Sequence, residues 1–65
     1  MNWQTYRVTL APADGARVKS IHYVQAHTRS EARTDALLQQ IQLDLEDGMF
    51  RRWAATVIQP MGSGA

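Results

Sequence analysis

A single bounded helix signal dominates this 65-residue chain and limits what can be built around it. The segment Thr-Arg-Ser-Glu at 28–31 fits a capping box, in which the Thr28 hydroxyl accepts a hydrogen bond from the Glu31 amide. Good helix-forming residues follow, and Gly48 supplies the positive-φ residue that often ends a helix. The pattern predicts a helix over 29–47, roughly 28 Å long at about 1.5 Å per residue.

Strand patterns precede the helix. Residues 3–11 alternate, and the turn after them contains Asp14-Gly15, a signal for a tight type I′ turn. Residues 17–26 predict the return strand, although their alternation is irregular. Two interpretations stay open for it: both faces are partly covered, or a bulge near Ser20 shifts the register. The first strand has two faces, one with Tyr6, Val8 and Leu10 and the other with Trp3, Thr5, Arg7 and Thr9.

A third strand is predicted over 51–59, because Pro60 ends the strand pattern. Residues 61–65 are predicted to form a flexible tail. The order strand, strand, helix, strand predicts an α+β fold of the ββαβ type. Because crossovers between parallel strands are right-handed, the third strand should lie beside the first. We therefore expect one domain over 1–60, with a three-stranded antiparallel sheet of order 2-1-3 and the helix on one face.

The length of the chain predicts association. A domain this small buries only about 60% of its extended-chain surface, and small domains are usually stabilised by disulfides, metals or further subunits. Cysteine is absent, so we expect oligomerisation, most simply a homodimer. No signal peptide or membrane span is recognisable, which predicts a cytoplasmic protein without membrane contact.

The sequence contains no catalytic, cofactor or metal motif. There is no Gly-rich phosphate loop and no nucleophile elbow. His22 and His27 stand five residues apart, so a regular strand would direct them to opposite faces, and no third metal ligand accompanies them. We therefore predict no enzyme activity, no cofactor and no metal.

The predicted helix is apolar on two sides. At about 100° per residue, one side gathers four large residues and the other gathers two alanines and a leucine. A helix that is apolar on both sides is usually buried on both. Either one wide stripe wraps around the sheet, or the second side binds a partner, and we favour the partner. The two sets are Leu37, Leu38, Ile41 and Leu45, and Ala32, Ala36 and Leu43.

Charge is sorted by segment although the net charge is only +1. Five of the seven bases fall in predicted strands and five of the six acids fall in the helix. Three of the acids occupy the last helical turn, where the helix dipole disfavours negative charge. We interpret the helix as the candidate protein-binding surface, formed by Glu31, Asp35, Asp44, Glu46 and Asp47 together with Leu37, Leu38, Ile41 and Leu45.

The sheet offers an alternative partner. Aromatic rings that alternate with basic side chains on an open sheet face can stack bases and contact phosphates. No RNA-binding sequence motif is present, which makes nucleic acid the less favoured partner. The candidate nucleic-acid-binding residues are Trp3, Arg7, Arg17, Lys19, Tyr23, Arg51, Arg52 and Trp53, with Thr5, Thr9, Ile21 and Ala55 on the same predicted face.

The layout resembles small ββαβ accessory proteins of phages, prophages and plasmids. The resemblance is carried by the Asp14-Gly15 hairpin, by the segment 24–32 and by a closing strand. Some proteins of this class are anti-CRISPR inhibitors, which bind host effector complexes without catalysis. The resemblance implies a stoichiometric protein binder and transfers no site residues.

These observations predict a non-catalytic protein-interaction module that binds a host protein or a second copy of itself. An inhibitor carried by a phage or mobile element fits this prediction. The first alternative is a nucleic-acid-binding protein that uses the basic, aromatic sheet face. The second is a structural or assembly subunit.

Overall fold

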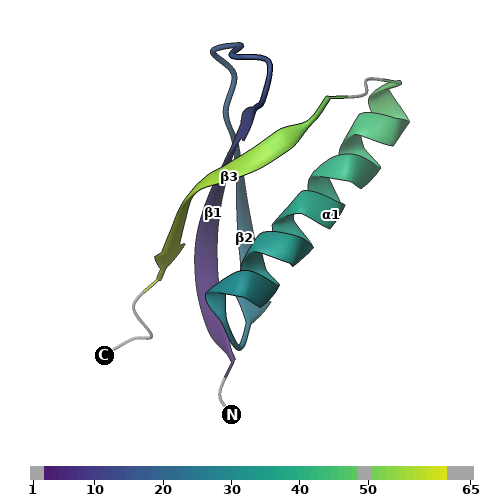
Figure 1. The fold of residues 1–65 in the computed structure, drawn as a ribbon. Helices are drawn as coiled ribbons and strands as arrows, with labels where there is room; N and C mark the ends of the chain where they lie inside the picture. Colours follow the sequence, from purple (N-terminus) through teal and green to yellow (C-terminus); the bar gives the residue numbers. More distant parts are fainter. Residues whose placement is uncertain (1–2, 49–50, 62–65) are drawn as a thin grey trace.

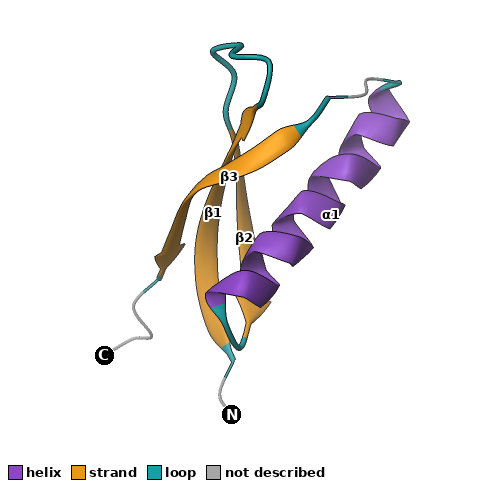
Figure 2. Cartoon of the chain, viewed as in Figure 1, coloured by secondary structure: helices purple, strands orange, loops and turns teal. Residues whose placement is uncertain are grey.

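The computed structural model describes residues 3–48 and 51–61 and contains one sheet and one helix. The strands are antiparallel neighbours in the order β2-β1-β3. Figure 1 shows α1 lying across one face of the sheet, while the other face is covered by no element of the described residues, and Figure 2 separates the two layers by colour. The predicted ββαβ fold and strand order are confirmed. The elements are β1 (Gln4–Pro12), β2 (Ser20–Ala26), α1 (Arg29–Asp47) and β3 (Trp53–Pro60).

The helix begins and ends where its capping residues predict. Thr28 is extended at φ −138°, and its hydroxyl accepts from the Glu31 amide at 3.1 Å. Gly48 is left-handed at φ 71°, and its N–H donates to the carbonyls of Asp44 and Leu45. The carboxylate of Glu31 lies 3.5 Å from Nδ1 of His27. The local sequence therefore fixes both ends of α1, because each end satisfies backbone groups that the helix itself leaves without partners.

The small side of the helix packs on the sheet. Ala32 and Ala36 are fully buried, and the stripe continues through Gln40 and Asp44. Alanine lets the helix approach the sheet closely. The sequence pattern assigns Leu43 to this side, but Leu43 is 47% exposed. Each four-residue step rotates the stripe by about 40°, so the stripe has moved past the position of Leu43 near the end of the helix.

The central strand supplies most of the core. Tyr6, Val8 and Leu10 are buried under the helix, as their alternation predicts. From β2 the core receives Val24 and Ala26. These side chains and the two alanines of α1 form a single apolar layer between sheet and helix, and β1 lies in the middle of it because it pairs with both other strands.

The second strand is regular, and both interpretations of its irregular pattern are wrong. Its register with β1 is continuous from Gln4 opposite Ala26 to Leu10 opposite Ser20. The inward face alternates cleanly with the outward face, where Ile21 and Tyr23 are exposed. The pattern misleads because a core position of β2 is held by His22, a polar residue that the alternation counts as exposed.

The irregularity of the sheet lies instead in β3. Thr9 pairs with Val57, whereas Leu10 pairs with Ala55, so Thr56 is an extra residue. The Thr56 hydroxyl donates to the Thr9 carbonyl at 3.2 Å. A bulge of this kind reverses the facing of every residue before it. Residues 53–55 therefore point to the opposite face from that expected of an unbroken strand.

The loop between β1 and β2 is wider than predicted. A type I′ turn needs positive φ at both central residues, yet of Asp14 and Gly15 only Gly15 is left-handed, at φ 82°. The Asp14 carboxylate accepts from the Ala16 amide at 3.0 Å, which holds the chain in a local turn. Arg17 and Lys19, expected within the strand, lie exposed in this loop because pairing begins only at Ser20.

The chain end is held as far as Met61, whose amide donates to the Thr5 carbonyl at 2.8 Å. Met61 is the first residue of the predicted tail over 61–65, and the residues 62–65 lie outside the described part of the chain. Within the described residues no helix combines the length and apolarity needed to cross a membrane.

The close contact of helix and sheet makes a test possible. We expect Ala36→Leu to destabilise the fold by about 1–3 kcal/mol, because extra methylene groups at a filled site force side chains and backbone apart. Leu43→Ala, on the exposed flank of the same helix, should change stability by no more than about 0.5 kcal/mol. Urea denaturation followed by circular dichroism measures the free energy of unfolding of both variants. Equal destabilisation would contradict the observed orientation of α1, in which Ala36 faces the sheet and Leu43 does not.

Candidate protein-interaction site

A buried carboxylate connects the helix to the third strand. Nε1 of Trp53 donates to Oδ2 of Asp44 at 2.7 Å, and Nε2 of Gln40 donates to Oδ1 at 3.0 Å. Asp44 is only 9% exposed. The prediction that Asp44 belongs to an exposed acidic binding surface is therefore wrong, because its carboxylate accepts hydrogen bonds from side chains of the same chain.

The same hydrogen-bond system reaches the second strand. Oε1 of Gln40 accepts from the Ser20 hydroxyl at 2.5 Å and lies 2.8 Å from Nε2 of His22. Nδ1 of His22 lies 3.3 Å from Oε1 of Gln39. His22 is thus a core residue whose ring nitrogens meet amide oxygens of α1. Among the described residues no cluster of three His, Cys, Asp or Glu side chains could hold a metal.

Sequence reasoning missed Gln40 as part of this system. A signal was present, since Ala32, Ala36, Gln40 and Asp44 follow one another at four-residue steps. Such a row lies on one face of a helix. A polar residue that continues a buried alanine row needs a hydrogen-bond partner inside the protein, and here β2 and β3 supply it.

The predicted basic and aromatic sheet face is not assembled. The bulge at Thr56 turns Trp53 and Ala55 toward the helix, where both pack against the core. Arg51 and Arg52 accompany Trp53 along a groove on the helix side. Arg17 and Lys19 lie in the loop, so of the predicted set only Arg7 and Tyr23 share the open face of the paired strands.

The open face is largely uncharged. Arg7 stands at its centre between Tyr23 and Gln59, and its Nη2 donates to Oε1 of Gln59 at 2.8 Å. Ile21 and Val57 are exposed on either side of Thr9. Trp3 lies at the end of this sheet, where its ring stacks on His27 with centroids 3.9 Å apart.

On the helix side of the sheet, the inward side chains are buried along β2 but remain partly exposed along β3. The inward residues of β2 from His22 onward are buried, whereas Trp53, Ala55 and Ile58 of β3 are only partly buried. A groove of about 330 Å³ runs between α1 and the start of β3. Its lining residues are Leu37, Ile41, Arg51, Arg52 and Trp53.

Next to this groove the outward side of α1 is apolar. We call Leu38, Ile41 and Leu45 the outer helix face; they are 55%, 50% and 57% exposed. Ile41 belongs to both features, since it also lines the groove. The outer helix face and the groove therefore form one continuous apolar surface, and the second side of the predicted two-sided helix is uncovered.

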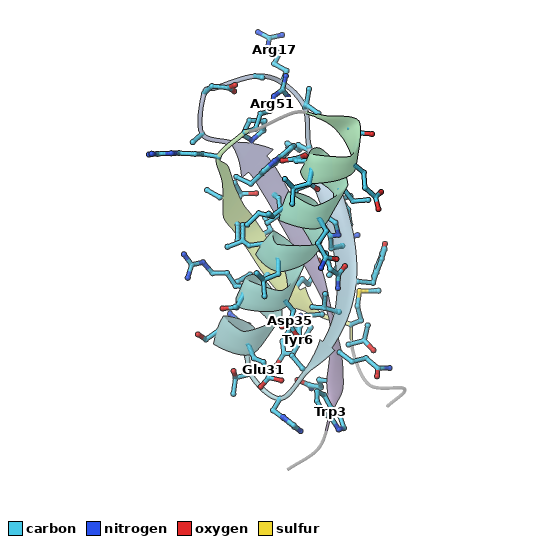
Figure 3. All side chains as sticks on the ribbon, turned by 90° about the vertical axis from the view of Figure 1, so that its right-hand side faces the viewer. Trp3, Tyr6, Arg17, Glu31, Asp35 and Arg51 are labelled. Carbon is cyan, nitrogen blue, oxygen red and sulfur yellow. The ribbon has the colours of Figure 1, made fainter. Side chains whose placement is uncertain are left out.

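Opposite charges border this surface. Glu31, Asp35 and Gln39 form one row of α1, and Gln39 contacts His22 of β2, so this row marks the flank nearer β2. Glu46 follows Gln39 by seven residues, or two turns, on the same flank. We call Glu31, Asp35 and Glu46 the acidic flank. Figure 3 shows Glu31 and Asp35 near the beginning of the helix.

The other border is basic. Arg33 precedes Leu37 by one turn in the row that lines the groove, and Arg51 and Arg52 also line that groove. We call these three residues the basic flank. Figure 3 places Arg51 at the end of the molecule opposite Glu31. The remaining acid of the predicted set, Asp47, is exposed at the last helical position.

No family model, curated protein or solved structure matches this chain.

The buried carboxylate gives a second test. We expect Asp44→Ala to cost about 1–3 kcal/mol of folding free energy, because it leaves the partly buried donor of Trp53 and the buried donor of Gln40 without an acceptor. Asp47→Ala should be neutral or stabilising, since it removes an exposed negative charge from the helix C-terminus. Chemical denaturation of both variants decides this, and equal destabilisation would rule out a specific role for Asp44.

Proposed function

We propose that this chain is a non-catalytic protein-interaction module whose binding surface is the outer helix face with the adjoining groove. One observation carries the proposal, namely the imbalance between exposed and buried apolar residues. Ten large apolar side chains are exposed in the described part of the chain, while only four are buried: Tyr6, Val8, Leu10 and Val24.

The helix side combines exposed apolar residues with a groove and charged borders. Exposed apolar residues scattered singly need no explanation, but a contiguous patch with a polar rim indicates an interaction site. Leu38, Ile41 and Leu45 are contiguous with the groove beside Trp53, and charged flanks lie on both sides. Protein interfaces are enriched in apolar, aromatic and arginine residues relative to the rest of the surface and have a polar rim.

The candidate residues retained from the sequence are the outer helix face, Leu37 and the acids Glu31, Asp35, Glu46 and Asp47. Asp44 leaves the set because it is buried, and Trp53, Arg51 and Arg52 join it from the former nucleic-acid set. The partner class that fits is protein, since an apolar strip along a helix packs on a second apolar strip.

The resemblance to ββαβ accessory proteins of mobile elements supports a stoichiometric inhibitor as the biological setting. In that setting the chain acts by occupying a surface of a host complex, and its function is occupancy without turnover. The nucleic-acid alternative is less favoured, because the basic and aromatic residues that it requires are divided among the groove, the loop and the open face.

The proposal predicts that an acidic residue in the outer helix face abolishes protein association. Leu38→Asp with Leu45→Asp should eliminate both self-association and stoichiometric capture of a purified partner, because the charges cannot be desolvated in an apolar contact. Sedimentation and pull-down are the measurements.

The matched control carries Ile21→Asp and Val57→Asp on the open sheet face and should associate as the original chain does. A monomeric original chain that also captures no stoichiometric protein partner would refute the proposed function. So would a control variant that loses association while the helix variant keeps it.

A further inference from the structure

We propose that the occupant of the outer helix face is a second copy of this chain, related by a two-fold axis parallel to α1. In this dimer the two helices run in the same direction. The acidic flank of each copy lies against the basic flank of the other. The inference rests on the proposed function, since it names the partner of the same surface.

The order of features around the helix is the starting point. Viewed from outside, the basic flank and the groove lie toward β3, the outer helix face lies in the middle, and the acidic flank lies toward β2. One border of the apolar surface is thus positive and the other negative. A surface with this polarity is self-complementary only if the symmetry operation brings unlike borders together.

A two-fold axis parallel to the helix brings unlike borders together. Rotation about it exchanges the two flanks and leaves each residue at its own height along the helix. Near the beginning of the helix, Arg33 then faces the region of Glu31 and Asp35 of the other copy. Near the end of the helix, Arg51 and Arg52 face the region of Glu46 of the other copy. Opposite charges therefore face each other at the same height along the two helices.

A two-fold axis perpendicular to the helix gives the opposite result. The helices then run antiparallel, each flank meets its own copy, and the heights are inverted. Arg51 and Arg52 would approach Arg33, while Glu46 would approach Glu31 and Asp35. Juxtaposed like charges at an interface oppose association. The charge pattern therefore selects the parallel arrangement.

The apolar residues have the spacing that a parallel pair requires. Leu38 and Leu45 are seven residues apart with Ile41 between them, which is the a, d, a spacing of a heptad. Leucine and isoleucine at these positions pack against the same residues of a parallel partner. The contact would cover side chains that are half exposed in the isolated chain and would also close the groove beside Trp53.

The dimer also accounts for Glu46, whose negative charge at the C-terminal end of α1 is disfavoured by the helix dipole. The last turn of α1 contains no basic residue. Within the described residues, neither Arg51 nor Arg52 lies within ion-pair distance of a carboxylate of its own chain. Two arginines and an unfavourably placed Glu46 thus have no intrachain compensation there, and the two-fold axis supplies it from the other copy.

Single cysteine variants test the geometry directly, because the natural chain has no cysteine. A disulfide requires Cα atoms within about 7 Å, which a parallel pair offers to equivalent positions near the axis. We expect Leu38→Cys alone and Leu45→Cys alone each to form a disulfide-linked dimer under mild oxidation, while Val57→Cys on the open sheet face forms no disulfide-linked dimer. Cross-linking only in a mixture of the two helix variants would show an antiparallel pair and overturn the inference.

Charge reversal tests the flanks. We expect Arg51→Glu with Arg52→Glu, and separately Glu46→Lys, to weaken dimerisation roughly tenfold or more through like-charge contact. Mixing the two variants should restore affinity as a heterodimer, because each reversed flank then meets its complement. Glu46→Lys places a favourable charge at the helix C-terminus, so a lost dimer cannot be attributed to a destabilised helix.

The outcomes separate this inference from the proposed function. A monomer at tens of micromolar that captures a stoichiometric protein partner through the outer helix face overturns the dimer and leaves the proposed function standing. Unchanged dimerisation after charge reversal overturns the parallel arrangement. Salt-dependent binding of a single-stranded oligonucleotide by a monomeric chain, lost on reversal of Arg51 and Arg52, overturns it in favour of nucleic acid.

Discussion

The rotation of α1 about its own axis depends on a short system of buried hydrogen bonds. Asp44 accepts from Trp53 of β3 and from Gln40, and Gln40 meets Ser20 and His22 of β2. A buried polar group without a partner is costly, so these bonds favour the rotation that keeps Asp44 and Gln40 paired with the two strands. That rotation places the alanine row on the sheet and directs Leu38 and Leu45 outward.

This orientation of α1 buries less apolar area than the opposite one would, but it allows the buried polar side chains to form hydrogen bonds. Turning the leucine side inward would bury more area at about 25 cal/mol per Å², but the larger side chains would hold the helix away from β1. The alanine side allows close packing and leaves the larger apolar residues for another contact. A small domain of this kind gains from association, because its own core consists of Tyr6, Val8, Leu10 and Val24 with a few alanines.

The bulge at Thr56 has consequences for function that exceed its size. By reversing the facing of Trp53, it gives Asp44 its donor and removes an aromatic ring from the open sheet face. Arg51 and Arg52, which precede β3, line the groove beside Trp53. One inserted residue thus moves an aromatic ring from one face of the sheet to the other, and the proposed interaction surface depends on it.

The sequence by itself determined the features that local chemistry controls. The Thr28 cap and Gly48 set the helix bounds, alternation placed Tyr6, Val8 and Leu10 in the core, and chain order with right-handed crossover led to the sheet order. Only the tertiary structure decided which face of the protein His22, Asp44 and Trp53 occupy. Their positions depend on hydrogen bonds between residues far apart in the chain and on a bulge that no local pattern marks. For this reason the fold followed from the sequence, while the face that each candidate residue occupies followed from packing.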